Sequence, residues 1–449
     1  MGLNANDRES TSVAPVVAQA SSLASSSPES EAYEDGEEEE EGVILRKSPP
    51  LASAHRSQSP TLLVTTLNEF DPVTQRLLRL YVDRTSILLL STPPNPSNPF
   101  VRHVIPLAFS DPLIMNVVLA VGGFPWYAGE DNRKVEALRL RYYGDAIRGL
   151  KLALTDWSTG RNRDAVRLLL ATILLCLHEC IRGNEGGTLF QHLRASRQFA
   201  QAVLAKHQDD YASDLVGVLL EAYAYYELCS SMRLLPEHND IDAACQLSSL
   251  WAEKISLYRT FGSLFGSLFA LYKVIPFVCQ LAKDRKVEIV QRTDMGCYAT
   301  FTRLRHMLQA WNGADGVYNN YNNKPDAEAA AENVVRNSLL LFLYSSYYHD
   351  TEFLRHVSQS LVDESIESLS VAAKTTWIHP IFWSMVVIAT HATTAEQQAK
   401  LMALMPTEIP LVTRAMGILK WIWEESEDIF GLDGLVMFTK AHRTTILFG

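Results

Sequence analysis

The feature that most constrains this chain is a nearly unbroken apolar stretch at residues 165–181. A helix that is apolar on every face belongs at the centre of a large helical bundle. Gly183, Gly186 and Gly187 break the chain after it; they follow no strand and lack the spacing of a dinucleotide-binding loop. A second helix is predicted from Thr188 to about Lys206. The sequence therefore predicts an α-helical core built around residues 165–181.

Helical patterns continue over the rest of the chain from about residue 68. Asp71-Pro72 and Asp111-Pro112 have the form of helix starts, with Asp as the cap and Pro in the first turn. Alternation with a period of two is almost absent, and no repeat register emerges. With 449 residues, of which 47% are hydrophobic, the chain can bury a large core. We predict one all-α, multi-helix domain over residues 67–449.

Residues 1–66 have a different composition, rich in Ser, Pro, Ala and Glu. Residues 1–60 contain 11 acidic and four basic residues and so carry −7 of the net charge of −11. This composition predicts a disordered acidic tail. Its run of glutamates at residues 37–41 and its three Ser-Pro pairs fit either a solubilising tail or a phosphorylatable interaction tail. Neither part of the chain has the surplus of Lys and Arg that strong DNA binding needs.

The compartment is constrained by the cysteines and by the lack of a membrane segment. The best membrane candidate, residues 261–282, is interrupted by Lys273 and Pro276, so we interpret it as a buried helix. The cysteines lie in apolar or helical surroundings and form no short paired framework, which indicates a reducing interior, cytosol or nucleus. The six are Cys176, Cys180, Cys229, Cys245, Cys279 and Cys297.

Two motifs have side chains that could carry chemistry. In the sequence Cys-Leu-His-Glu-Cys at residues 176–180, Cys176 and Cys180 share a helix face while His178 points away, so structural thiols are favoured over a metal site. His349 and Asp350 are adjacent and cannot face each other on a helix, which favours a surface or capping role. No phosphate loop and no nucleophile elbow is present. The sequence predicts no catalytic residue, no metal ligand and no cofactor, and therefore no enzyme.

Five short patterns occur in an order that resembles a known family. The first two groups are Asn98-Pro99-Phe100 with Ile105-Pro106-Leu107-Ala108 and Asp111-Pro112-Leu113-Ile114, and then Tyr143-Gly144-Asp145-Ala146-Ile147-Arg148-Gly149-Leu150. The later ones are Leu174-Leu175-Cys176-Leu177-His178-Glu179 with Gln191-His192-Leu193-Arg194-Ala195, then His379-Pro380-Ile381-Phe382, and Ile418-Leu419-Lys420-Trp421-Ile422-Trp423-Glu424. Together they resemble the fungal-specific transcription factor domain, the regulatory region that follows the six-cysteine zinc cluster in many fungal regulators.

The resemblance implies a nuclear, all-helical module that acts on transcription, often of metabolic or secondary-metabolite genes. The first cysteine is Cys176, so we expect no zinc cluster in residues 1–66 and only indirect contact with DNA. The implied partners are another transcription factor or co-regulator, or a small-molecule effector. The alternatives are a helical adaptor or ligand-binding protein outside transcription, and an all-α enzyme such as a terpene cyclase. The enzyme would need an Asp-rich metal-binding helix that the sequence lacks.

Overall fold

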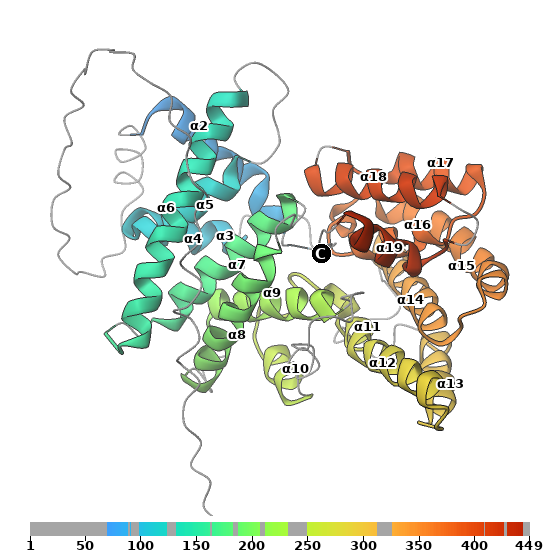
Figure 1. The fold of residues 1–449 in the computed structure, drawn as a ribbon. Coiled ribbons are helices and arrows are strands. Elements are labelled where there is room, and N and C mark those ends of the chain that lie inside the picture. The colour runs from blue at the N-terminus through green and yellow to red at the C-terminus, as the bar shows by residue number, and fades with distance from the viewer. Residues whose placement is uncertain are drawn as a thin grey trace, which may run out of the picture. The chain divides into compact units, whose positions relative to one another are not determined.

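The computed structural model describes residues 70–88, 90, 98–123, 132–161, 164–182, 187–206, 212–231, 249–311, 326–407, 409–425 and 429–442. All of them belong to the unit Gln58–Gly449. Every regular element within these ranges is a helix (Figure 1), which confirms the predicted all-α fold. The acidic tail predicted at residues 1–66 lies outside the described residues.

The helices follow one another along the chain. The first half contains α2 Pro72–Asp83, η1 Thr85–Ile87, α3 Pro99–Arg102, α4 Val104–Ser110, α5 Pro112–Gly122, α6 Asn132–Ser158, α7 Ala165–Arg182, α8 Thr188–Lys206, α9 Asp214–Ser231 and α10 Ser249–Ser256. The second half contains η3 Gly266–Leu268, α11 Phe269–Tyr272, α12 Ile275–Gln291, α13 Cys297–Gln309, α14 Asp326–Tyr347, α15 Thr351–Ala372, η5 Thr376–Ile378, α16 Phe382–Thr390, α17 Ala395–Leu404, α18 Pro410–Glu424 and α19 Leu432–His442.

The two predicted helix starts are confirmed. The Asp71 carboxylate accepts hydrogen bonds from the backbone N–H groups of the first turn of α2, and Asp111 does the same for α5. Both caps are followed by a proline, which needs no N–H partner at that position. Asp111 also receives two hydrogen bonds from the Arg167 guanidinium of α7. The same carboxylate therefore begins one helix and fixes it to another.

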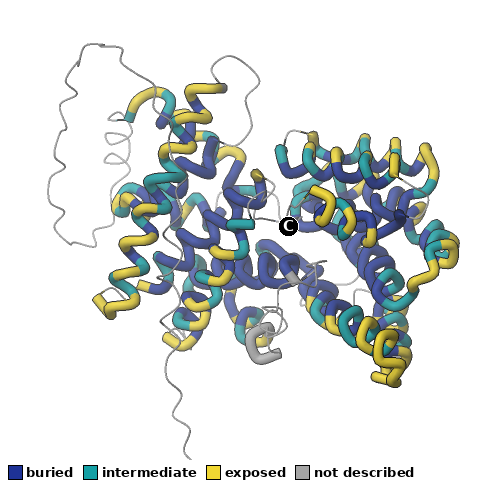
Figure 2. Tube along the Cα trace, in the orientation of Figure 1, coloured by how far each residue is buried: buried dark blue, intermediate teal, exposed yellow. Residues whose placement is uncertain are grey.

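Helix α7 is the central helix that the apolar stretch predicted. Every residue from Leu168 to Ile181 is buried. The helix is covered by α5, α6, α8, α9 and α18, and it lies among other buried segments (Figure 2). One contiguous apolar core extends from Leu77 in α2 to Leu435 in α19.

The segment predicted as one buried helix at residues 261–282 is buried but is not one helix. Its chain turns through residues 261–265, continues as η3 and α11, and begins a new helix at α12, where Pro276 occupies the first turn. The turn is held by Glu221 of α9, whose Oε1 accepts the N–H groups of Gly262, Leu264 and Phe265 at 2.9 to 3.0 Å. These backbone groups therefore bond to a carboxylate instead of closing a helical turn.

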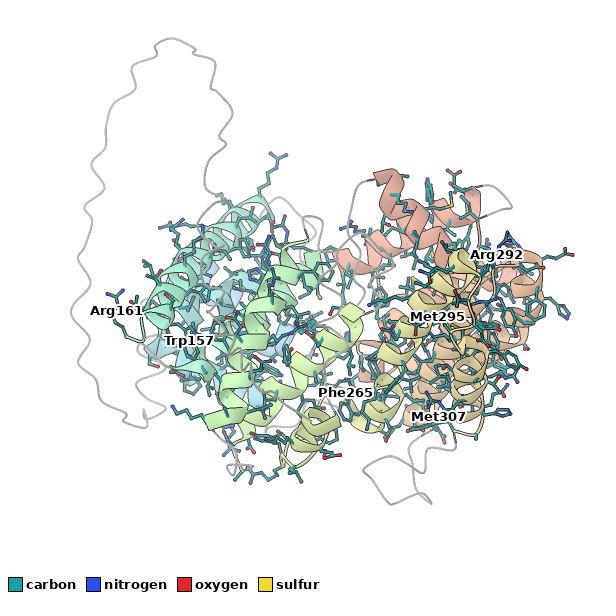
Figure 3. The ribbon with its side chains drawn as sticks, turned by 60° about the horizontal axis from the view of Figure 1, so that its bottom comes forward. Trp157, Arg161, Phe265, Arg292, Met295 and Met307 are labelled. Atoms are coloured by element: carbon teal, nitrogen blue, oxygen red, sulfur yellow. The ribbon has the colours of Figure 1, made fainter. Side chains whose placement is uncertain are left out.

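A second sharp turn joins α12 to α13. Arg292 and Gly296 both adopt left-handed backbone conformations, with φ of 52° and 72°. Between them the Glu288 carboxylate accepts the N–H group of Met295 at 3.2 Å. Figure 3 shows Arg292 and Met295 at this turn, and Phe265 within the body. None of the described helices combines the length and the apolar character needed to cross a lipid bilayer.

Candidate functional site

The His-Glu pair of the 176–180 motif belongs to a buried polar network between α6 and α7. Arg139 of α6 contacts His178 Nε2 through Nη1 at 2.7 Å. Tyr143 stacks on the His178 ring with centroids 4.3 Å apart. Its hydroxyl donates to Glu179 Oε1 at 2.7 Å. Glu136 pairs with Arg139 from the preceding turn of α6. The network joins two long helices by hydrogen bonds through their apolar interface.

The protonation state of this network follows from its donors. A guanidinium can only donate, so His178 Nε2 accepts and the ring proton lies on Nδ1, which faces Glu179 Oε1 at 3.4 Å. Burial, supported by the Arg139 charge, lowers the pKa of His178 to about 4. Burial alone would raise the pKa of Glu179, but hydrogen bonds from His178, Thr188 and Tyr143 outweigh it and lower this pKa to about 2. A neutral imidazole thus lies between a cation and an anion.

The flanking thiols are core side chains. Cys176 and Cys180 are buried and unoxidised, and burial raises the pKa of the Cys176 thiol well above its ordinary value. No cluster of three or more His, Cys, Asp or Glu side chains with metal-binding geometry occurs among the described residues. Cys245 lies outside them. Asp350 caps α15 by accepting the N–H group of Phe353 at 2.9 Å, as predicted, and His349 beside it is exposed.

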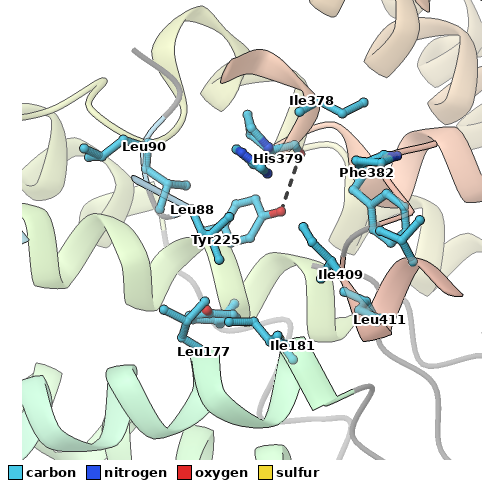
Figure 4. Close-up of a pocket in the computed structure, with 16 residues that line it drawn as sticks. Leu88, Leu90, Leu177, Ile181, Tyr225, Ile378, His379, Phe382, Ile409 and Leu411 are labelled. Atoms are coloured by element: carbon cyan, nitrogen blue, oxygen red, sulfur yellow. Dashed lines mark hydrogen bonds between the residues drawn. The ribbon is translucent and has the colours of Figure 1, made fainter. Parts of the chain in front are cut away.

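A cavity lies against α7, in the part of the helix that carries Leu177, Cys180 and Ile181 (Figure 4). We refer to this cavity as the α7 crevice. It has a volume of about 70 Å³ and is partly open to solvent. No Asp, Glu, Lys or Arg is among its lining residues. They are Leu88, Leu90, Leu177, Cys180, Ile181, Tyr225, Tyr226, Leu264, Ile378, His379, Pro380, Phe382, Pro406, Ile409, Leu411 and Val412.

The polar groups of the crevice gather around Pro380. Its carbonyl oxygen accepts the Tyr225 hydroxyl at 3.4 Å and, more closely, the Tyr272 hydroxyl. Trp383 Nε1 donates in turn to the Tyr272 oxygen at 2.7 Å. The His379 ring makes no hydrogen bond to another described residue. Burial lowers the pKa of His379 to about 4, so the ring is neutral at pH 7 and offers one donor and one acceptor.

Sequence reasoning did not find the crevice. It predicted no binding residue, although His379 and Pro380 were among the residues that carried the family resemblance. The walls come from six segments between Leu88 and Val412, and only the folded chain brings them together. A histidine next to a proline before an apolar helix was the one signal present, and it does not by itself distinguish a cavity from a turn.

These features define an all-helical protein with an uncharged crevice beside its central helix and a buried polar network on another face of that helix. The chain belongs to the fungal specific transcription factor domain family, whose model matches residues 76–430. That range covers α7, the network and the whole crevice, and it confirms the resemblance drawn from the sequence. No curated protein and no solved structure was found to match the chain.

Proposed function

We propose that this chain is a regulator or co-regulator of fungal transcription that acts in the nucleus through its helical body. The supporting observation is the family match over residues 76–430, which includes nearly every described helix. The buried polar network favours a binding or scaffolding role over catalysis, because its charged groups are paired with one another inside the interface of two helices. We therefore propose no enzymatic activity.

The chain is proposed to reach DNA through a partner that carries its own DNA-binding module. No cysteine precedes Cys176, so residues 1–175 cannot supply a six-cysteine zinc cluster. Acidic residues outnumber basic ones by 51 to 40, whereas phosphate contacts require clustered Lys and Arg. The partner class is another transcription factor or co-regulator, and the target genes are proposed to be metabolic, including secondary-metabolite clusters.

A tethering experiment tests this function directly. The full chain, fused to an unrelated DNA-binding domain, should change the output of a reporter that carries the matching sites. Leu174→Asp places a charge at a fully buried position of α7 and should abolish the effect. Leu152→Asp, at a position 70% exposed on α6, is the matched control and should retain it.

Two results would contradict the proposal. The first is nanomolar binding of the purified chain to a defined promoter in physiological salt, which would remove the need for a partner. The second is a deletion strain whose transcriptome is unchanged under every condition in which the protein is expressed. A helical adaptor outside transcription is the alternative, and cell fractionation that finds the chain only in the cytoplasm would support it.

A further inference from the structure

We propose that the α7 crevice is a binding site for a small, uncharged, mostly aliphatic molecule that carries one hydroxyl or carbonyl group. The walls supply the first argument. Leu177 and Ile181 of α7 and Leu411 and Val412 of α18 present branched aliphatic side chains to the same space. An apolar group of a ligand that covers these side chains removes their surface from water, which is favourable.

The size of the cavity limits the ligand. An apolar cavity that accommodates benzene measures about 150 Å³, and the α7 crevice has about 70 Å³. The enclosed part therefore fits a branched end such as an isobutyl group better than an aromatic ring. The open side allows the remainder of a larger molecule to extend toward solvent.

The absence of charge from the lining limits the ligand further. An ionised group that entered would lose its hydration and gain no counter-charge from the residues of the crevice, which is costly in an apolar environment. A carboxylate or ammonium compound of the same shape should therefore bind much more weakly than the neutral one. The uncharged lining therefore favours alcohols, aldehydes, ketones and esters over amino acids and organic acids.

The hydrogen-bonding groups of the crevice determine where a polar group of the ligand would bind. The Pro380 carbonyl already receives two hydroxyl groups, so it is not the main partner for a ligand. His379 has unused hydrogen-bonding capacity, because its neutral ring provides a donor and an acceptor and bonds to no other described residue. A ligand hydroxyl or carbonyl group directed at this ring would satisfy both partners.

The position of the crevice gives the ligand a regulatory consequence. It lies against α7 and α9 and against the connections that flank α16 and α18. A bound molecule would favour the arrangement in which all of these segments contact it. The proposal that a ligand binds depends only on the crevice. The proposal that this ligand regulates the protein rests on the proposed function in transcription.

Binding is tested with the purified full chain and three probes of nearly equal shape. These are 3-methylbutan-1-ol, 1-chloro-3-methylbutane and the anion 3-methylbutanoate, measured by saturation-transfer NMR in a titration at pH 7. We expect saturable binding of the alcohol, and binding of the anion that is weaker by about tenfold or more. Failure of the alcohol to saturate, or equal affinity for the anion, would overturn the proposal.

Variants locate the site. Ile409 lines the crevice, so Ile409→Trp should fill it and abolish binding, whereas Leu152→Trp adds the same ring at an exposed position of α6 and should leave binding unchanged. His379→Phe keeps the ring shape and should weaken the alcohol by about fivefold but not the chloride, because only the alcohol loses a hydrogen bond. Thermal unfolding of each variant without ligand identifies any that do not fold. If Ile409→Trp does not fold, the affinities of His379→Phe for the alcohol and the chloride decide whether the ligand binds in the crevice.

The same measurements separate this proposal from the proposed function. Binding that follows the predicted pattern, in a chain that leaves reporter output unchanged when tethered, would retain the site and reject the transcriptional role. An active tethered chain that binds none of the uncharged probes would do the opposite.

Discussion

Gly266 adopts a left-handed backbone conformation with φ of +53°, and a Cβ added there would lie 2.2 Å from the Trp377 ring. Gly266→Ala should therefore lower the free energy of unfolding by about 3 kcal/mol, since both the backbone and the buried ring must shift. Gly417 in α18 is the matched control, because no atom lies within 4 Å of its added Cβ. Gly417→Ala should raise the free energy of unfolding by about 0.5–1 kcal/mol. Denaturant titration measures both, and equal effects would contradict the argument.

Glu221 should make the free energy of unfolding depend on pH. It is fully buried, and this burial raises its pKa to about 7 although the N–H groups of residues 262–265 act in the other direction. Since the folded-state pKa exceeds the ordinary value of 4.5, the stabilisation from this group is complete below pH 4.5 and is lost as pH rises to about 7. Glu221→Gln removes that loss. Its unfolding free energy relative to the parent chain should therefore increase between pH 5 and pH 8.

The difference in unfolding free energy between the parent protein and the Glu221→Gln variant isolates the contribution of Glu221. His178, His379 and His391 also titrate, and burial lowers the pKa of each to about 4, but they are present in both proteins and cancel in the difference. A difference in unfolding free energy that stays constant with pH would show that the Glu221 carboxyl group does not change its proton affinity on folding.

At the scale of whole helices, α5 depends on one side chain both for its start and for its attachment to α7. Asp111 caps α5 and also pairs with Arg167 of α7, whereas the hydrogen bonds of the Asp71 side chain to other described residues all lie within the first turn of α2. Asp111→Ala should lower the free energy of unfolding by about 2 kcal/mol, and Asp71→Ala by about 1 kcal/mol, the usual cost of a lost cap. Thermal and denaturant unfolding of the two variants, side by side, measure the difference. Equal losses would mean that the Arg167 pair adds nothing.

The helices that sequence reasoning located correctly have signals within their own residues. The Asp-Pro starts of α2 and α5, the apolar faces of α7 and the bounds of α8 are of this kind. The interpretation of residues 261–282 as one helix was wrong, because a carboxylate of α9 holds the turn and lies more than 40 positions away in the chain. The α7 crevice could not be predicted from the sequence for the same reason. Its walls depend on contacts between segments that no local pattern encodes.

Over the whole molecule, the apolar core runs through both halves of the helix order. Helix α7 packs on α18, and α9 packs on α12. A chain divided within residues 232–248 should therefore fold only when both pieces are present. We expect fragments 58–240 and 241–449 to co-purify when co-expressed, and each alone to be insoluble or to bind a hydrophobic dye. A cooperative unfolding transition from either fragment alone would show that the halves are independent domains.

The burial of α7 also determines how fast its backbone amides exchange their hydrogens with solvent. The residues from Leu168 to Ile181 are all buried, so their amide hydrogens should not be exposed by local fraying at the surface. They exchange with deuterium only when the body opens as a whole, and their exchange rates then report the global free energy of unfolding. The amides of α7 should therefore be among the slowest to exchange in the described part of the chain.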